Sequence, residues 1–128
     1  MRGANLIITL APQTIGMQST GTEYFKLALA IKSILTVVNL QFYNSGSMLG
    51  CDGNVYSQGT VNFLTALACI ELQGGLAPSQ VGLGLPANAS GAGGGAVAPS
   101  VVNAALDRDA GASYNFVNTV SPHLSTLP

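Results

Sequence analysis

The chain has 128 residues, of which 48% are hydrophobic and only 7% are charged, and its formal net charge is −1. No cluster of Lys and Arg is present, so electrostatics exclude nucleic acid and anionic membrane surfaces as partners. Every apolar run breaks well before the ~18 residues that a membrane-spanning helix needs. We therefore expect a soluble single domain over residues 1–128.

The first predicted element is a buried parallel strand over Leu6–Leu10, a short apolar run that Ala11-Pro12 closes. Met1–Asn5 lead directly into this run without a long hydrophobic region or a cleavage site, so no signal peptide is predicted and the localisation is left open. Gly21-Thr22 predict the start of a helix, because the apolar residues that follow recur at helical spacing. That apolar face consists of Tyr24, Phe25, Leu27, Ala28 and Ile31.

The second predicted strand covers Thr36–Tyr43 and separates two chemically different faces. Since side chains alternate along a strand, Leu40 and Phe42 belong to a helix-packing face, and Gln41 and Tyr43 belong to a polar interior face. The strand ends in hydrogen-bonding side chains. Parallel α/β folds place their ligand sites at such strand ends.

A long loop rich in Gly and Ser is predicted over Ser45–Gly59, followed by a helix over Val61–Leu72. Thr60 is a suitable N-cap for this helix, and Gly74-Gly75 end it. The apolar positions of the helix form one stripe, which predicts the face that packs on the sheet. The stripe consists of Val61, Leu64, Leu67, Ala68 and Leu72.

A third strand is predicted over Val81–Leu85, and Pro86 closes it. Gly82 and Gly84 alternate along this strand, so one of its faces is almost bare. A bare face lets backbone or a ligand approach closely.

The remaining elements are a loop and two helices. The Gly/Ala/Ser segment Asn88–Ala96 contains neither common phosphate-loop pattern and is predicted to be a mobile loop. Pro99 suits the first turn of a helix that runs to Leu106, and Tyr114–Leu124 predict a weaker last helix. The order β-α-β-α-β-α-α favours a parallel sheet with right-handed crossovers.

The two cysteines lie in different predicted elements, Cys51 in the long loop and Cys69 on the second helix. Two cysteines without a nearby His do not form a zinc pattern, and no metal site is predicted. Free thiols are the favoured state, and a disulfide is the alternative.

Other ionisable residues carry no catalytic pattern. Asp52 is interpreted as a turn residue that uses its side chain locally. Glu23 and Glu71 lie on predicted helices and are interpreted as solvated. His123 has no nucleophile motif around it and is interpreted as a solvent-facing helix residue.

Several segments carry a recognisable combination of motifs. The second strand ends in Gln41-Phe42-Tyr43-Asn44, and the loop after it contains Gly50-Cys51-Asp52-Gly53. This combination resembles the bacterial secreted chitinases of glycoside hydrolase family 18. The other matching segments are similar to strands and helices in the second half of that family's barrel: Leu6–Thr14, Tyr56–Leu67, Val81–Ala87 and Gly93–Asp107.

The resemblance implies an α/β fold, namely a partial (β/α)8 (TIM) barrel of about three parallel strands with flanking helices. A closed barrel usually needs roughly 250 residues. The family's acid motif, Asp-x-x-Asp-x-Asp-x-Glu, does not occur in the chain, and the chain has no Trp, although a Trp ends the family's eighth strand. After Asp107 the sequence passes almost directly to Ser113–Leu124, which resembles the family's final helix. We therefore expect the eighth strand to be missing.

The resemblance also implies residue roles. In family-18 enzymes the substrate's own N-acetyl oxygen attacks the anomeric carbon while one Glu protonates the leaving oxygen. By position Tyr43 matches the family Tyr whose hydroxyl binds the acetamido oxygen, Asn44 falls where many members have an Asp that touches sugar and acid, and Gln41 lines the pocket. Tyr43 and Asn44 are the predicted catalytic residues, and all three are predicted to bind substrate. The alternatives are that Tyr43 packs under the following loop and that Gln41 is a buried amide satisfied by backbone.

The implied function is that of a chitinase-related protein, which hydrolyses β-1,4 N-acetylglucosamine linkages, with an incomplete active site in this chain. The alternatives are a chitin-oligosaccharide binder without turnover and an inert oligomeric barrel fragment. The expected partners are chitin or N-acetylglucosamine oligosaccharides and further copies of the chain. Open strand edges and an uncovered interior face at Gly82, Gly84, Gln41 and Tyr43 favour such a homo-oligomer. No cofactor is implied.

Overall fold

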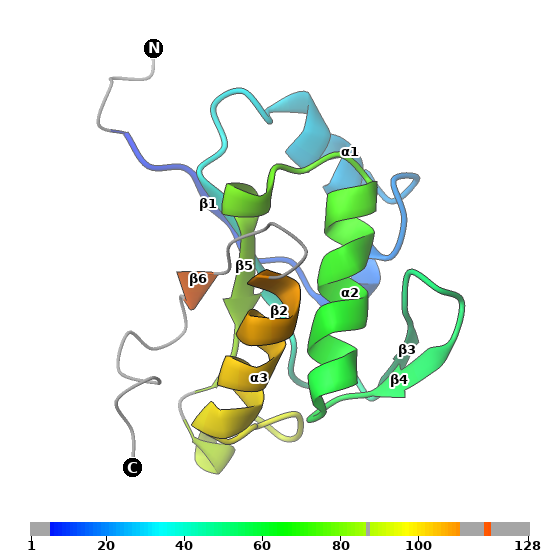
Figure 1. Ribbon diagram of the computed structural model, residues 1–128. Helices are drawn as coiled ribbons and strands as arrows, with labels where there is room; N and C mark the ends of the chain where they lie inside the picture. The colour runs from blue at the N-terminus through cyan, green and yellow to red at the C-terminus, as the bar shows by residue number, and fades with distance from the viewer. Residues whose placement is uncertain (1–5, 87, 111–116, 119–128) are drawn as a thin grey trace.

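The computed structural model describes residues 6–86, 88–110 and 117–118 (Figure 1). The strands are β1 (Thr9–Leu10), β2 (Val37–Gln41), β3 (Ser47–Leu49), β4 (Val55–Ser57), β5 (Val81–Gly84) and β6 (Val117–Asn118). The α-helices are α1 (Glu23–Ala30), α2 (Val61–Gln73) and α3 (Pro99–Ala110), and short 3-10 helices are η1 (Thr14–Met17), η2 (Pro78–Gln80) and η3 (Ala89–Gly91). Among the described residues, no helix combines the length and the hydropathy needed to cross a bilayer.

A parallel sheet in the order β1-β2-β5-β6 organises the fold. At its centre β2 pairs with β5, so that Val38 lies opposite Val81 and Gln41 opposite Gly84. An α-helix follows each of β1, β2 and β5 before the next strand of this sheet, as the hydrophobic pattern predicts. Figure 1 shows α2 and α3 side by side, and these helices contact each other. The parallel α/β class is confirmed, and the sheet does not close into a barrel within the described residues.

The core lies between β2, β5 and the helices. Leu40 and Phe42 are at most 1% exposed, whereas Gln41 and Tyr43 are half-buried. The ring of Phe42 meets that of Phe63 on α2 edge to face, with centroids 6.1 Å apart. The predicted alternation between an apolar helix-packing face and a polar face is therefore confirmed over residues 40–43, at the end of β2 and just after it.

The second predicted helix is confirmed with its ends. The Oγ1 atom of Thr60 accepts a hydrogen bond from the Phe63 N–H at 3.2 Å, which caps α2. The helix ends at Gln73 with Gly74 as its C-cap. Three residues of the predicted stripe are buried, and the other two are partly buried against the core; the buried ones are Leu64, Leu67 and Ala68.

The first predicted helix is confirmed, but its buried face is narrower than predicted. Phe25 and Ala28 are fully buried in α1, whereas Tyr24 is 37% exposed and Leu27 is 47% exposed. A helix of 8 residues makes little more than two turns, so only a narrow stripe of it reaches the core.

The expectation that no strand follows the third helix is wrong. Val117 and Asn118 form β6, which pairs in parallel with β5 so that Val117 lies opposite Gly82. The predicted helix over Tyr114–Leu124 is wrong at these two residues, and its remaining residues lie outside the described part. Pairing with an open edge of β5 overrides a weak local helical pattern.

The segment predicted as a long loop contains a second, two-stranded sheet. β3 and β4 pair antiparallel, with Met48 opposite Tyr56. The tip of this hairpin is joined to α2 by a disulfide between Cys51 and Cys69, whose Cα atoms are 5.8 Å apart. The prediction of free thiols is wrong, because the hairpin brings Cys51 back onto the helix that carries Cys69.

The close approach predicted at Gly82 and Gly84 is confirmed, but the expectation that their face is uncovered is wrong, because both glycines are buried. A Cβ atom on Gly82 would lie 2.6 Å from Oδ1 of Asn39 and 2.9 Å from Cγ2 of Val37. Side chains of the neighbouring β2 thus occupy the space that the glycines leave. Gly84 is enclosed by backbone, since a Cβ atom there would lie 2.7 Å from the Leu40 carbonyl oxygen.

Glu71, expected to be solvated, is fully buried. It follows Leu67 and Ala68 by one helical turn and therefore shares their core-facing side of α2. Neither carboxyl oxygen has a hydrogen-bond partner within the described residues. Burial without a partner raises the pKa of Glu71 well above its ordinary value and favours the neutral acid.

Candidate functional site

The candidate site lies at the carboxyl end of β2, between the ends of β1 and β5. Backbone pairing continues past the strand, since the Gln41 N–H donates to the Pro12 carbonyl at 3.0 Å and the Phe42 N–H donates to the Gly84 carbonyl at 3.0 Å. The segments that follow three neighbouring strands therefore meet at one edge of the sheet. Ligand sites of parallel sheets are found at this edge.

Gln41 is the last residue of β2, and its side chain is half-buried. Its Nε2 atom donates to the Ala11 carbonyl at 2.7 Å, which ties the ends of β1 and β2 together. The amide oxygen has no hydrogen bond among the described residues. One half of the amide is thus satisfied by backbone, and the other half is an open acceptor at the strand end.

Tyr43 follows β2 by two positions and is half-buried. Its carbonyl oxygen accepts a hydrogen bond from Oγ of Ser45 at 3.0 Å, which folds the chain tightly after the strand. The phenolic hydroxyl has no hydrogen-bond partner in the described part of the chain. An amphipathic side chain with a fixed backbone and a free hydroxyl suits a ligand contact.

Asn44 is the residue that shapes the strand end. It has φ +53°, and no other residue except glycine has positive φ within the described ranges. Its Oδ1 atom accepts hydrogen bonds from the N–H groups of Gly93 at 2.8 Å and Gly94 at 3.1 Å. Its own N–H donates to the Gly94 carbonyl at 2.9 Å. Asn44 therefore joins the loop after β5 to the end of β2, and its Nδ2 group is left for any contact with a ligand.

Sequence reasoning singled out Gln41, Tyr43 and Asn44, and the structure brings them together at this edge. Sequence reasoning missed Ser45, whose Oγ also accepts a hydrogen bond from Oγ1 of Thr14 at 2.8 Å. Ser45 thereby links the segment after β1 to the segment after β2. The available signal was the dense run of short polar residues directly after a strand, which is typical of chains that fold back on themselves.

No acid in the described part of the chain is placed as a proton donor at this edge. Asp52 uses both carboxyl oxygens inside its own hairpin, accepting from the Asn54 N–H at 3.0 Å and from the Tyr56 hydroxyl. The Tyr56 hydrogen bond lowers the pKa of Asp52, so this group is ionised at neutral pH. The prediction that Asp52 acts within its own turn is confirmed. The described residues also contain no cluster of three or more His, Cys, Asp or Glu side chains suited to a metal.

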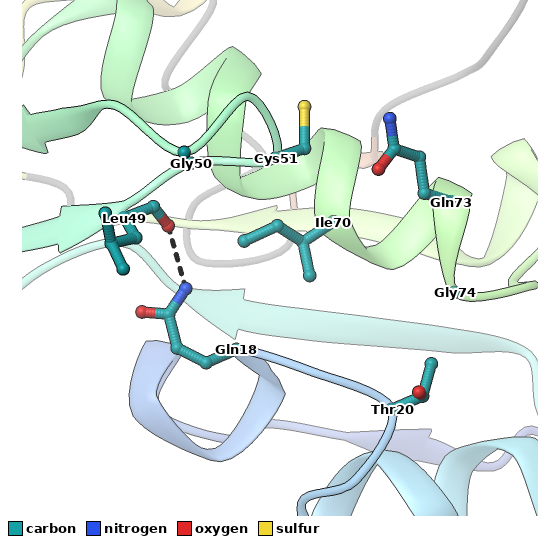
Figure 2. Close-up of a pocket in the computed structure, with 9 residues that line it drawn as sticks. Gln18, Thr20, Leu49, Gly50, Cys51, Ile70, Gln73 and Gly74 are labelled. Carbon is teal, nitrogen blue, oxygen red and sulfur yellow. Dashed lines mark hydrogen bonds between the residues drawn. The ribbon is translucent and has the colours of Figure 1, made fainter.

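A pocket lies elsewhere, between η1, the β3–β4 hairpin and the end of α2 (Figure 2). It has a volume of about 460 Å³. Gln18 and Gln73 line it together with Ile70, and Nε2 of Gln18 donates to the Leu49 carbonyl at 2.8 Å. None of Gln41, Tyr43 and Asn44 lines this pocket. The site at the strand end is the stronger candidate, because the segments after three strands meet there beside Gln41, Tyr43 and Asn44.

No family model matches the sequence. Among curated proteins, the chain is 36% identical over 124 residues to Chitinase D of Niallia circulans and 30% identical over 132 residues to Exochitinase 1 of Streptomyces olivaceoviridis. Each match covers 82% of this chain, but only 24% and 22% of the respective relatives. The chain thus spans about a quarter of the length of these relatives.

Solved structures give a similar result. A structure from Streptomyces coelicolor assigned as Chitinase A is 73% identical, with a TM-score of 0.80 over 82% of this chain and 36% of that one. A family GH18 chitinase from Chromobacterium violaceum shares the fold at 24% identity, with a TM-score of 0.69 over 81% of this chain and 33% of that one. Sequence and fold therefore agree on the same class of relative.

Proposed function

Since the chain is a family-18 chitinase-like segment, we propose that the strand end carrying Gln41, Tyr43 and Asn44 is part of a subsite for N-acetylglucosamine. The observation that carries this proposal is the unpartnered hydroxyl of Tyr43 at the edge where the ends of β1, β2 and β5 meet. A hydroxyl with no protein partner at such an edge suits a sugar with several hydrogen-bonding groups.

The chemistry of the proposed site follows from the substrate. In family-18 enzymes the acetamido oxygen of the substrate acts as the nucleophile, and a protein carboxylic acid protonates the leaving oxygen. Tyr43 would donate a hydrogen bond from its hydroxyl and orient the acetamido group, while the open amide oxygen of Gln41 and the Nδ2 group of Asn44 would hold neighbouring sugar groups. A donor held at the position where charge develops favours the transition state over the ground state.

The fold supports a finer architectural proposal. The parallel sheet β1-β2-β5-β6 with its helices would then be about half of a (β/α)8 barrel, and its carboxyl edge would form part of the rim that carries the active site. The site in this chain is then incomplete, because the acid motif of the family does not occur in the sequence. Hydrolysis of β-1,4 N-acetylglucosamine linkages would require an acid from outside these residues.

A second candidate is oligosaccharide binding without turnover. It is favoured by one observation, namely that none of the described acids is placed as a proton donor at the strand end: Asp52 is held in its hairpin, and Glu71 is enclosed in the core. In this reading Gln41, Tyr43 and Asn44 keep their binding roles and lose their part in catalysis. The third reading is an inert fragment that is stable as an oligomer.

Titration of the chain with chitotetraose, followed by product analysis of the same sample, separates these candidates. Binding with product formation supports a glycosidase, binding without products supports the binder, and no binding supports the inert fragment. The proposal of a sugar subsite predicts saturable binding in the first measurement. Absence of binding by a folded chain would overturn it.

A further inference from the structure

Gln58, directly after β4, contacts the candidate strand end with both its backbone and its side chain. Its N–H donates to the Gly46 carbonyl at 2.8 Å, and its Oε1 atom accepts a hydrogen bond from the Ser45 N–H at 2.8 Å. The same residue thus fixes two successive positions after Asn44. Neither contact belongs to a regular strand or helix, so the sequence pattern gave no sign of them.

The side chain of Gln58 also supports the glycine loop that follows β5. A Cβ atom on Gly94 would lie 2.6 Å from Nε2 of Gln58, and one on Gly95 would lie 2.9 Å from its Oε1. The same Cβ on Gly95 would lie 2.7 Å from Cα of Tyr43. Loop backbone therefore packs directly on both the Gln58 amide and the Tyr43 backbone, at a distance that only glycine permits.

Between these contacts lies a residue in an unfavourable conformation. Asn44 has φ +53°, which costs roughly 1 kcal/mol for a residue other than glycine. Such a conformation persists only where the surroundings determine it. Here the Asn44 N–H is held by the Gly94 carbonyl, and the next N–H along the chain is held by Gln58.

We propose that Gln58 is a positioning residue for Tyr43. By accepting the Ser45 N–H and supporting Gly94 and Gly95, it holds the backbone of Tyr43–Ser45 in the one conformation that places the phenolic hydroxyl at the strand end. Gln58 acts through Tyr43 and makes no contact with the sugar. This inference rests on the proposed subsite for its effect on binding, but its effect on Tyr43 itself is independent of any ligand.

Three variants test the proposal. Gln58→Met keeps the length and volume of the side chain but removes the acceptor, and Gln58→Glu restores an acceptor oxygen at the same length. Gln73→Met is the matched control, because Gln73 is an exposed glutamine in the other pocket whose side chain has no hydrogen bond among the described residues. If Gln58→Met does not fold, Gln58→Asn withdraws the oxygen by one bond and keeps the amide.

The ligand-independent measurement is NMR of the free chain. We expect Gln58→Met to speed hydrogen exchange of the Ser45 N–H by about tenfold or more, because its partly buried donor loses its acceptor. We also expect it to shift the ring signals of Tyr43. Gln58→Glu should return the Ser45 exchange rate and the Tyr43 ring signals toward those of the original chain. Gln73→Met should leave both observables unchanged. Unchanged exchange at Ser45 and an unchanged Tyr43 ring in Gln58→Met would overturn the proposal.

The binding measurement uses chitotetraose. We expect Gln58→Met to weaken binding about fivefold to tenfold and Gln58→Glu to recover most of the loss. Full affinity in Gln58→Met would overturn the positioning role. If the original chain itself binds no sugar, the proposed subsite fails, and the NMR measurement alone decides whether Gln58 positions Tyr43.

Discussion

The side-chain oxygen of Asn44 accepts a hydrogen bond from the backbone N–H of Gly93 at 2.8 Å, across 49 positions of sequence. This contact joins the end of β2 to the loop after β5. Tyr43 is adjacent in the chain, so its backbone is fixed by a contact that depends on two distant segments. The geometry of the candidate site therefore depends on contacts between the end of β2 and the loop after β5, and not on β2 alone.

On its own, the 128-residue chain should hydrolyse chitin oligosaccharides far more slowly than a complete family-18 chitinase. A positioned proton donor typically accelerates such a reaction by ~10²–10⁴-fold, and the acid motif that supplies it does not occur in this sequence. Product release from chitotetraose, followed over hours and compared with a complete enzyme, measures the difference. Turnover equal to that of the complete enzyme, and lost on substitution of an acid in this chain, would contradict the expectation.

Loss of the disulfide between Cys51 and Cys69 should destabilise the fold by about 3 kcal/mol in the loop-entropy model, given a sequence separation of 18. The physical reason is that the cross-link restricts the unfolded chain and holds the hairpin tip on α2. Urea unfolding with and without dithiothreitol measures the change. The double variant Cys51→Ala/Cys69→Ala is the control and should not respond to the reductant. An unfolding midpoint that dithiothreitol leaves unchanged in the original chain would show that the disulfide does not stabilise the fold.

The buried carboxyl of Glu71 should make stability fall as pH rises. The pKa of this group is raised in the folded state, so above its ordinary pKa of about 4.5 the folded chain binds more protons than the unfolded chain. The stabilising effect of the neutral acid is complete below that pH and is lost progressively on raising the pH toward the folded-state pKa. Glu71→Gln should flatten the dependence of the unfolding free energy on pH between pH 5 and 8.

Glu23→Gln is the matched control for this experiment, since the side chain of Glu23 is 92% exposed and forms only an (i, i+3) ion pair with Lys26. Exposed pairs of this kind contribute about 0–1 kcal/mol, so this substitution should leave the slope nearly unchanged. If the unfolding free energy of Glu71→Gln depends on pH as steeply as that of the original chain, the pKa of Glu71 is the same in the folded and unfolded states, which would contradict this expectation.

The helix Val61–Gln73 was predictable because its signals are local. Thr60 is a good N-cap, Gly74 is a good terminator, and the apolar stripe needs no knowledge of the rest of the chain. Glu71 was misplaced although it falls on that stripe, because carboxyl groups are seldom buried without a partner. The helical period was in this case a better guide than the residue type.

The position of the candidate residues at a strand end was predictable, whereas their roles in binding stay predictions. Gln41, Tyr43 and Asn44 stand out at a strand end, and the resemblance supplied their roles. The contacts that hold them could not be predicted. The Asn44–Gly93 and Ser45–Gln58 hydrogen bonds join segments that come close together only in the folded chain. For the same reason the pairing of Cys51 with Cys69 was missed, because it requires the β3–β4 hairpin to turn the chain back onto α2.

Self-association should be visible in solution. Large apolar side chains are exposed on several elements, among them Ile7 at 70%, Val55 at 65% and Ile15 at 62%. Together with a low content of charged residues, these side chains favour a dimer or higher oligomer. Light scattering at micromolar concentration measures the mass. A sharp monomer peak combined with cooperative thermal unfolding would contradict this expectation.

The most direct test of the proposed subsite is calorimetric titration of the chain and its Tyr43→Phe variant with chitotetraose. We expect the original chain to bind saturably and the variant to bind more weakly by about 1–2 kcal/mol, because one hydroxyl contact is lost. The thermal unfolding of the two chains should be the same, since the hydroxyl of Tyr43 has no partner within the described residues. Equal affinity of the two folded chains would show that the hydroxyl makes no sugar contact and that Tyr43 serves packing alone.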